Sequence, residues 1–333
     1  MSKKLTYLVL DCETATLPFA NEIAQNDANK KKKIAIARPL IYDIGWTICD
    51  RLGNILDSKQ FLIAEIFSVP AVFNTAYYAD KRPIYLEKLA NKEITIRPWL
   101  DVVDELIADM QKVNAIGAFN SMFDFKKAIP FTDLYINKLY SPDYYAWEQM
   151  QKNLCYHIAN EPYKKNEEKE FDPNVFLFHN IEYPLFDLWG LATTYLLNNV
   201  SYKNECLEHD LLTNSGIYFK TSAESTYQYL RNKYDFVEAH TALEDAIIES
   251  YILSKVAQRH SITIGIKFFP FRDLGYTTDF VTRTKKPKVA DVEKIIDAIN
   301  NYLIDKDTEF EPTAYVISLL NKLNTLNNYL GRD

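Results

Sequence analysis

An apolar stretch near the start of the chain limits what the rest can fold into. Residues 5–10, LTYLVL, have the pattern of a buried central strand that runs directly into Asp11, Cys12, Glu13 and Thr14. Side chains alternate between the faces of a strand, so we expect Asp11 and Glu13 on the same side. Two carboxylates there are costly to keep ionised without a cation, a base or water. The pattern indicates an α/β sheet with a metal site at the strand's carboxyl end, although a strand that merely reaches solvent also ends in charged residues.

The segments that follow predict an antiparallel beginning to this sheet. Residues 44–48 alternate in polarity, Gly53 marks a turn, and 55–63 returns as a strand. A packing helix is expected after Pro98, and a short buried strand is expected over 113–119.

A second acidic motif follows the strand over 113–119. Asn120 is a residue type that favours the helix N-cap, which predicts a helix whose first turn contains Asp124. The carboxyl end of this strand and that of the first strand can meet at one edge of a sheet, where α/β proteins place ligands.

A third motif opens a late helix. Thr241 and Glu244 have the spacing of a capping box, which predicts a helix that begins at Ala242. His240 then lies just before the helix and Asp245 lies about one turn inside it. An imidazole and a carboxylate so placed can face the same cleft.

Composition narrows the class of protein. The 333 residues are 47% hydrophobic, enough for one elaborated α/β domain or a domain with a smaller addition. The formal net charge of −7 offers no broad positive surface, so contact with nucleic acid must depend on local groups. The four cysteines have neither zinc-ligand nor disulfide spacing, which suits ordinary thiols in the cytoplasm. No signal peptide, membrane span or phosphate-binding glycine loop is expected.

Two regions exceed a simple domain. Residues 131–185 are too long for a connection and are interpreted as an inserted segment in a domain spanning 1–257. Tyrosines of this segment such as Tyr145 could stack on bases or pack in a helix core. Residues 258–333 predict a small C-terminal extension with two amphipathic helices. The lysines at 30–33 and the basic residues at 283–288 suit a solvated loop or a phosphate contact.

Taken in order, the three motifs resemble those of the DEDDh class of 3′→5′ exonucleases, the DnaQ-like group of the ribonuclease H-like superfamily. The resemblance covers residues 5–257 discontinuously, and it implies a ribonuclease H-like mixed sheet flanked by helices. The chain departs from the usual pattern at Phe119, where the family often has histidine, and at Thr16, where it often has glycine. Neither position supplies a metal ligand.

The resemblance also implies a chemistry. Asp11, Glu13, Asp124 and Asp245 would hold two divalent cations, Mg²⁺ or Mn²⁺, and His240 would act as general base. The cations, about 4 Å apart, would activate water and stabilise the leaving 3′ oxygen. By the same analogy, Thr14, Leu17 and Asn120 would bind substrate, with Leu17 as a wedge against the last base.

The implied substrate is the 3′ end of single-stranded DNA, from which nucleoside 5′-monophosphates are released. The enzyme would act alone or beside a polymerase or another replication or repair partner. RNA is the alternative substrate, because the same fold and site serve both. A catalytically silent nucleic-acid-binding module is the alternative from another class, and its expected mark is loss of an acid or of the base.

Overall fold

A computed structural model describes the chain over residues 5–20, 38–160, 172–213, 219–259 and 261–265. Two compact units are present: the first comprises Met1–Ala192 and Thr226–Phe268, and the second comprises Thr193–Ser225 and Phe269–Asp333. The basic runs at 30–33 and 283–288, and nearly all of the expected C-terminal extension, lie outside the described residues.

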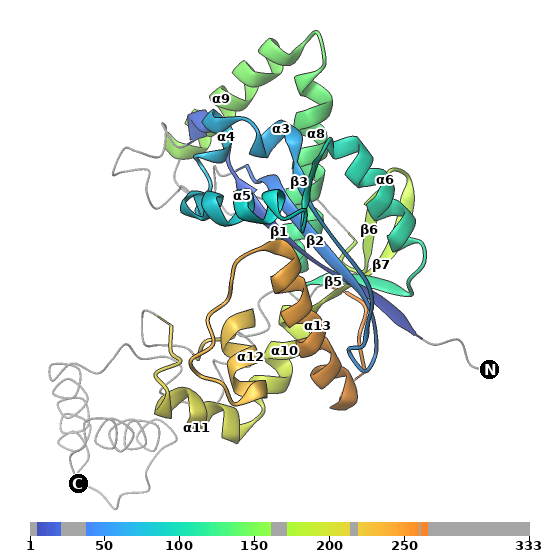
Figure 1. The fold of residues 1–333 in the computed structure, drawn as a ribbon, viewed down its shortest axis with the longest axis vertical. Coiled ribbons are helices and arrows are strands. Elements are labelled where there is room, and N and C mark those ends of the chain that lie inside the picture. The colour runs from blue at the N-terminus through green and yellow to red at the C-terminus, as the bar shows by residue number, and fades with distance from the viewer. Residues whose placement is uncertain (1–4, 21–37, 161–171, 214–218, 260, 266–333) are drawn as a thin grey trace, which may run out of the picture. The chain divides into compact units, whose positions relative to one another are not determined.

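The first unit contains a seven-stranded mixed sheet with the order β4-β3-β2-β1-β5-β7-β6. Its strands are β1 (Thr6–Ala15), β2 (Leu40–Asp50), β3 (Ile55–Ile63), β4 (Thr95–Arg97), β5 (Ala115–Ala118), β6 (Val175–Phe178) and β7 (Ile181–Asp187). β2 pairs antiparallel with β1 and with β3, as predicted, whereas β1, β5 and β7 run parallel. This α/β sheet with flanking helices is consistent with the ribonuclease H-like fold expected from the sequence (Figure 1).

Helices connect and cover the strands of the first unit. They are α3 (Ala64–Phe67), α4 (Pro70–Phe73), η2 (Ala79–Lys81), α5 (Arg82–Ala90), α6 (Trp99–Met110), α7 (Ser121–Phe123), the π-helical turn η3 (Asp124–Ala128), α8 (Ile129–Leu139), α9 (Tyr144–Asn160) and α13 (Ala242–Arg259). α10 (Leu188–Leu197) and α12 (Ala223–Arg231) each cross a boundary between the units, and α11 (Val200–Glu208) belongs to the second. Among the described residues, no helix is both long enough and apolar enough to cross a membrane.

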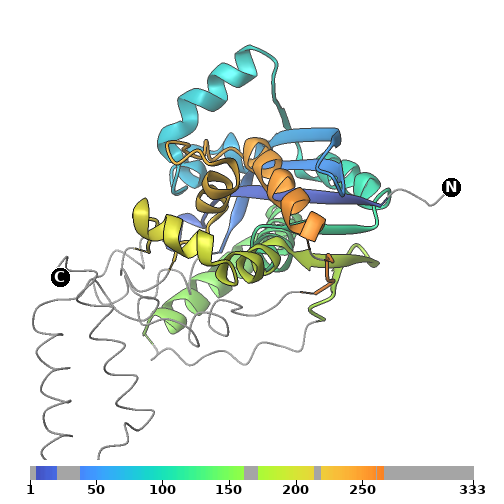
Figure 2. The same ribbon diagram turned by 90° about the horizontal axis from the view of Figure 1, so that it is seen from below.

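Strand β2 contacts a different helix on each face, because its side chains alternate between the two faces of the sheet. Thr47 places its hydroxyl 2.5 Å from that of Ser250 on α13. Its neighbour Trp46 points the other way, and its indole N–H donates to Asp109 on α6 at 3.0 Å. α13 and α6 therefore pack on opposite faces of the sheet; in Figure 2, α13 (orange) lies obliquely across the strands.

Gly45 allows α13 to approach the sheet closely. A Cβ atom at this position would lie 2.3 Å from the backbone nitrogen of Leu243 and 2.6 Å from the carbonyl carbon of Ala242. The first turn of α13 thus rests directly on the backbone of β2. Because Asp245 follows in the same turn, this contact determines how deeply its carboxylate reaches toward β1.

Two sequence expectations differ from the structure. β1 continues through Ala15, so Asp11 and Glu13 lie within the strand and not after its end; a register shift at Glu13/Thr14 bends this part of the ladder. The expected inserted segment, 131–185, contains α9 but also supplies β6 and most of β7, which pairs with β5. Pro184 hides this strand from sequence reasoning, since proline is unusual inside a sheet.

We expect the Gly45→Ala variant to lose about 3 kcal/mol of unfolding free energy, because backbone atoms of α13 have no room to give way. Urea denaturation followed by circular dichroism measures this loss. Ser58→Ala, at an exposed position of neighbouring β3, is the control and should change stability little. A Gly45→Ala variant as stable as the wild type would contradict the close packing.

Candidate active site

The structure brings the three sequence motifs to one place. The ligand atoms of Glu13, His240 and Asp245 all lie within 4.8 Å of one another. Asp11 and Asp124 belong to the same cluster, because the charge of Asp11 perturbs the pKa values of Glu13, Asp124 and Asp245. Segments from β1, η3 and α13 thus converge on one acidic site.

Ionising the acids of this site together costs free energy, and their pKa values are raised. Burial raises the pKa of Asp11 to about 7, and the charges of Glu238 and Asp43 add to this rise. Burial first, and then the charge of Asp11, raise the pKa of Asp245 to about 9 and that of Glu13 to about 10. Burial and Asp11 also hold the pKa of Asp124 well above its usual range. Positive charge among these groups would remove much of the penalty.

The donor set fits a hard divalent cation. Asp124 Oδ1 and Asp245 Oδ1 are buried, and neither has a hydrogen-bond partner among the described residues. Such orphaned carboxylate oxygens are what Mg²⁺ or Mn²⁺ would take as ligands. Asp11, Glu13, Asp124 and Asp245 are therefore the residues that would hold the ions.

Asp124 is positioned by a carboxylate from another strand. Asn120 precedes the helix as expected and has the left-handed φ of 83°, but its side chain makes no capping hydrogen bond, so the predicted capping role is wrong. Asp187, at the end of β7, accepts instead from the backbone N–H of Ser121 at 3.2 Å and from that of Gly190 at 3.2 Å. This links the turn before Asp124 to the start of α10.

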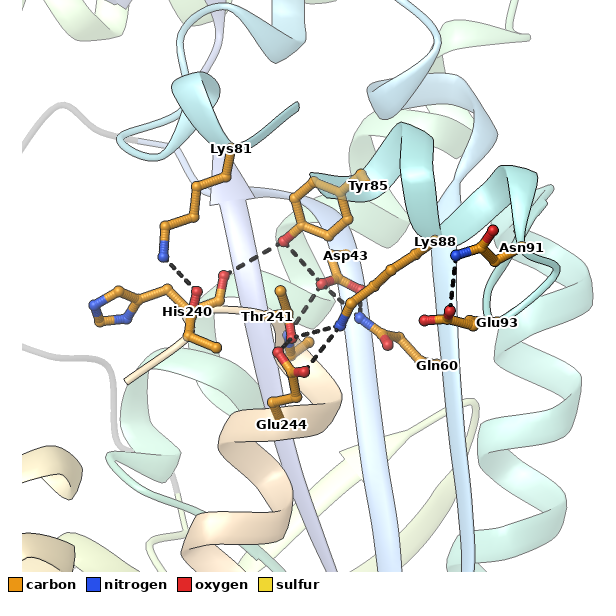
Figure 3. Close-up of polar contacts among 12 residues, drawn as sticks. Asp43, Gln60, Lys81, Tyr85, Lys88, Asn91, Glu93, His240, Thr241 and Glu244 are labelled. Atoms are coloured by element: carbon orange, nitrogen blue, oxygen red, sulfur yellow. Dashed lines mark hydrogen bonds and ion pairs between the residues drawn. The ribbon is translucent and has the colours of Figure 1, made fainter. Parts of the chain in front are cut away.

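Asp43 fixes the start of α13 and was missed by the sequence analysis. The helix begins at Ala242 as predicted, and the N–H of Ala242 donates to Asp43 Oδ2 at 3.0 Å. Tyr85 Oη also donates to Asp43, at 3.0 Å, and Gln60 donates to both carboxylate oxygens (Figure 3). Asp43 is fully buried and pairs across the strands with Glu13. A lone acid in the apolar stretch LIYDIGW was the signal that could have found it.

Glu249 is a further acid that the motifs did not include. It lies one helical turn after Asp245 on α13, it is 2% exposed, and it accepts from the N–H of Phe119 at 3.2 Å. Burial raises its pKa well above the usual range, and the charges of Asp11 and Asp124 raise it further. Its place four residues after Asp245, on the same face of the predicted helix, was the sequence signal that could have identified it.

His240 is held by an aromatic side chain from a distant segment. The ring stacks on Tyr78, with centroids 4.3 Å apart and planes 15° apart, and Tyr78 Oη lies 3.2 Å from His240 Nε2. Nδ1 faces the acids, 4.0 Å from Asp245 Oδ2 and 3.8 Å from Glu238 Oε2. The backbone of His240 has a left-handed φ of 54°. The motifs singled out neither Tyr78 nor Glu238.

Residues of η2 and α5 also form polar contacts with the loop that carries His240 and with the start of α13. Lys81 donates to the carbonyl oxygen of Ala239, and Tyr85 Oη lies 3.5 Å from the carbonyl oxygen of His240. Lys88 forms an ion pair with Glu244 at 3.1 Å (Figure 3). Positions 81, 85 and 88 follow the i, i+4, i+7 spacing of one helix face, a signal that the sequence analysis left unassigned.

The expected substrate-binding residues are placed unequally. Thr14 is partly buried at the end of β1, and Asn120 is exposed. Leu17 is only 2% exposed and belongs to the hydrophobic core, so in this structure it packs and does not present a wedge at the surface.

Comparison of the chain with protein-family models, with curated proteins and with solved structures found no match. The functional argument therefore rests on the residues of the site and their arrangement.

We expect Mn²⁺ to raise the melting temperature of the protein by several degrees, because ion binding favours the folded state. Chelation with EDTA should reverse the rise, and Asp124→Asn or Asp245→Asn should abolish it. Differential scanning fluorimetry measures the effect. Glu208→Gln is the control, since it alters a separate group at the C-terminal end of α11, formed by Glu205, Glu208 and His209. The assignment of the metal ligands would be contradicted if Mn²⁺ no longer raised the melting temperature of Glu208→Gln but still raised that of Asp124→Asn.

Proposed function

We propose that the protein is a metal-dependent 3′→5′ exonuclease that hydrolyses phosphodiester bonds at the end of single-stranded DNA. The observation that carries the proposal is the convergence of Asp11, Glu13, Asp124 and Asp245 beside His240. Buried acids with orphaned oxygens supply the ligands, and an imidazole at their edge supplies a base.

Each residue has a chemical task in the proposed reaction. The two cations would polarise the scissile phosphate and stabilise the charge on the leaving oxygen. The four carboxylates would fix the place where the phosphate binds. His240 would take the proton of the attacking water at Nδ1, the nitrogen that faces the acids. Tyr78, at Nε2, would keep the ring in the orientation that this transfer requires.

We expect Mg²⁺-dependent release of mononucleotides from a single-stranded oligonucleotide labelled at its 5′ end, seen as a ladder that shortens from the 3′ end. His240→Ala should lower the rate about 100-fold or more, because general-base catalysis is worth at least that much. Gel electrophoresis of matched DNA and RNA oligonucleotides, with Mg²⁺ and with EDTA, measures the rate and the preferred sugar.

A blocked 3′ end is the control for direction, because a 3′→5′ exonuclease requires a free terminus. Binding of oligonucleotides with no cleavage of any end would contradict the proposed reaction and favour the silent module. Faster cleavage of RNA would reassign the substrate without changing the mechanism.

We expect Tyr78→Phe to lower kcat roughly fivefold while leaving KM within twofold. The variant loses a hydrogen bond to His240, worth about 1 kcal/mol, but keeps the stacked ring. Steady-state kinetics on the same DNA oligonucleotide measure both constants. Tyr140→Phe, at a tyrosine that is 72% exposed, is the matched control and should behave as the wild type. A rise in KM with unchanged kcat would contradict the positioning role.

A further inference from the structure

A short turn between α4 and η2 is anchored to two of the three motif segments. At its start, the hydroxyl of Thr75 accepts from the backbone N–H of Thr16, just past β1, at 2.8 Å. At its end, Tyr78 stacks on His240. Tyr77 lies between these anchored residues, so the turn holds it at the rim of the acidic site.

Tyr77 is displayed in a way that packing does not explain. Its side chain is 88% exposed, although residues on both sides of it are anchored. Its ring meets that of Tyr78 edge to face, with centroids 4.8 Å apart and planes 88° apart. This contact orients the ring while leaving most of its surface open.

We propose that Tyr77 is a stacking subsite for a nucleobase near the 3′ end of the substrate strand. The inference rests on the proposed function and adds to it the group that binds the base. A tyrosine ring suits this role because every base has a π face, so stacking tolerates any sequence, as an exonuclease requires.

The net charge of the protein favours a contact of this kind. The chain carries a formal net charge of −7, and acids crowd the site, so a polyanion gains little from long-range attraction. Lys81, a cation whose charge acts on Glu13 and Asp245, already donates to the carbonyl oxygen of Ala239. Leu17 is buried in the core. Stacking on Tyr77 supplies binding energy that does not depend on charge.

The test compares Tyr77→Ala and Tyr77→Trp with the wild type in steady-state cleavage of a single-stranded oligothymidylate with Mg²⁺. Tyr77→Ala should raise KM by about 5-fold to about 150-fold, the range found for losing one stacked base, with kcat within twofold. Tyr77→Trp, which keeps a flat ring, should remain within threefold of wild-type KM. Tyr140→Ala, at a tyrosine that is 72% exposed, is the matched control and should not change KM.

A second experiment removes the nucleobase that would stack on Tyr77, instead of the tyrosine itself. Oligonucleotides with one abasic residue at the first, second or third position from the 3′ end are cleaved by the wild type and by Tyr77→Ala. At one position the abasic residue should raise wild-type KM as much as Tyr77→Ala does and have little further effect on that variant.

Three results would overturn the inference while leaving the proposed function standing. They are an unchanged KM for Tyr77→Ala, additive effects of the variant and of every abasic residue, and a loss confined to kcat, which would mean that Tyr77 acts only through Tyr78. Failure of the wild type to cleave any oligonucleotide would instead remove the proposed function, and the stacking subsite with it. Equal melting temperatures of the variants exclude unfolding as the cause.

Discussion

The close approach of α13 to β2 is the contact on which the site depends. At Gly45 the absence of a side chain lets the backbone of Leu243 touch the sheet, and beside it Asp43 accepts from the N–H of Ala242. One strand thus sets both the depth and the starting point of the helix. Asp245 and Glu249 reach the acids of β1 because the helix sits there, and His240 lies at the rim because it precedes the same turn.

The cost of this arrangement is electrostatic. A fold that buries carboxylates together raises their pKa values, and it leaves an oxygen of Asp124 and one of Asp245 without a hydrogen-bond partner in the described part of the chain. Asp124 and Asp245 are only 2% and 4% exposed, so water does little to relieve the repulsion. In the proposed enzyme, a small, highly charged ion would suit this site, since it would offset several negative charges in little space.

The sequence was sufficient for elements whose signals are local. It predicted β3 over 55–63 and the start of α13 at Ala242, because alternation and capping spacing depend on neighbouring residues. It was insufficient where distant segments act: Asp187, not Asn120, caps the turn before Asp124. Asp43 and Tyr78 were missed for the same reason, since only the fold shows what their polar atoms meet. The motif order indicated which acids would gather, but not which groups hold them.

The turn from Thr75 to Tyr78 has a mechanical consequence. It is fastened to the chain just past β1 at one end and to the imidazole of His240 at the other. A load applied to the turn is therefore shared between the strand that carries Asp11 and the loop that carries His240. The positions of the Asp11 carboxylate and the His240 imidazole are thus tied to one short turn.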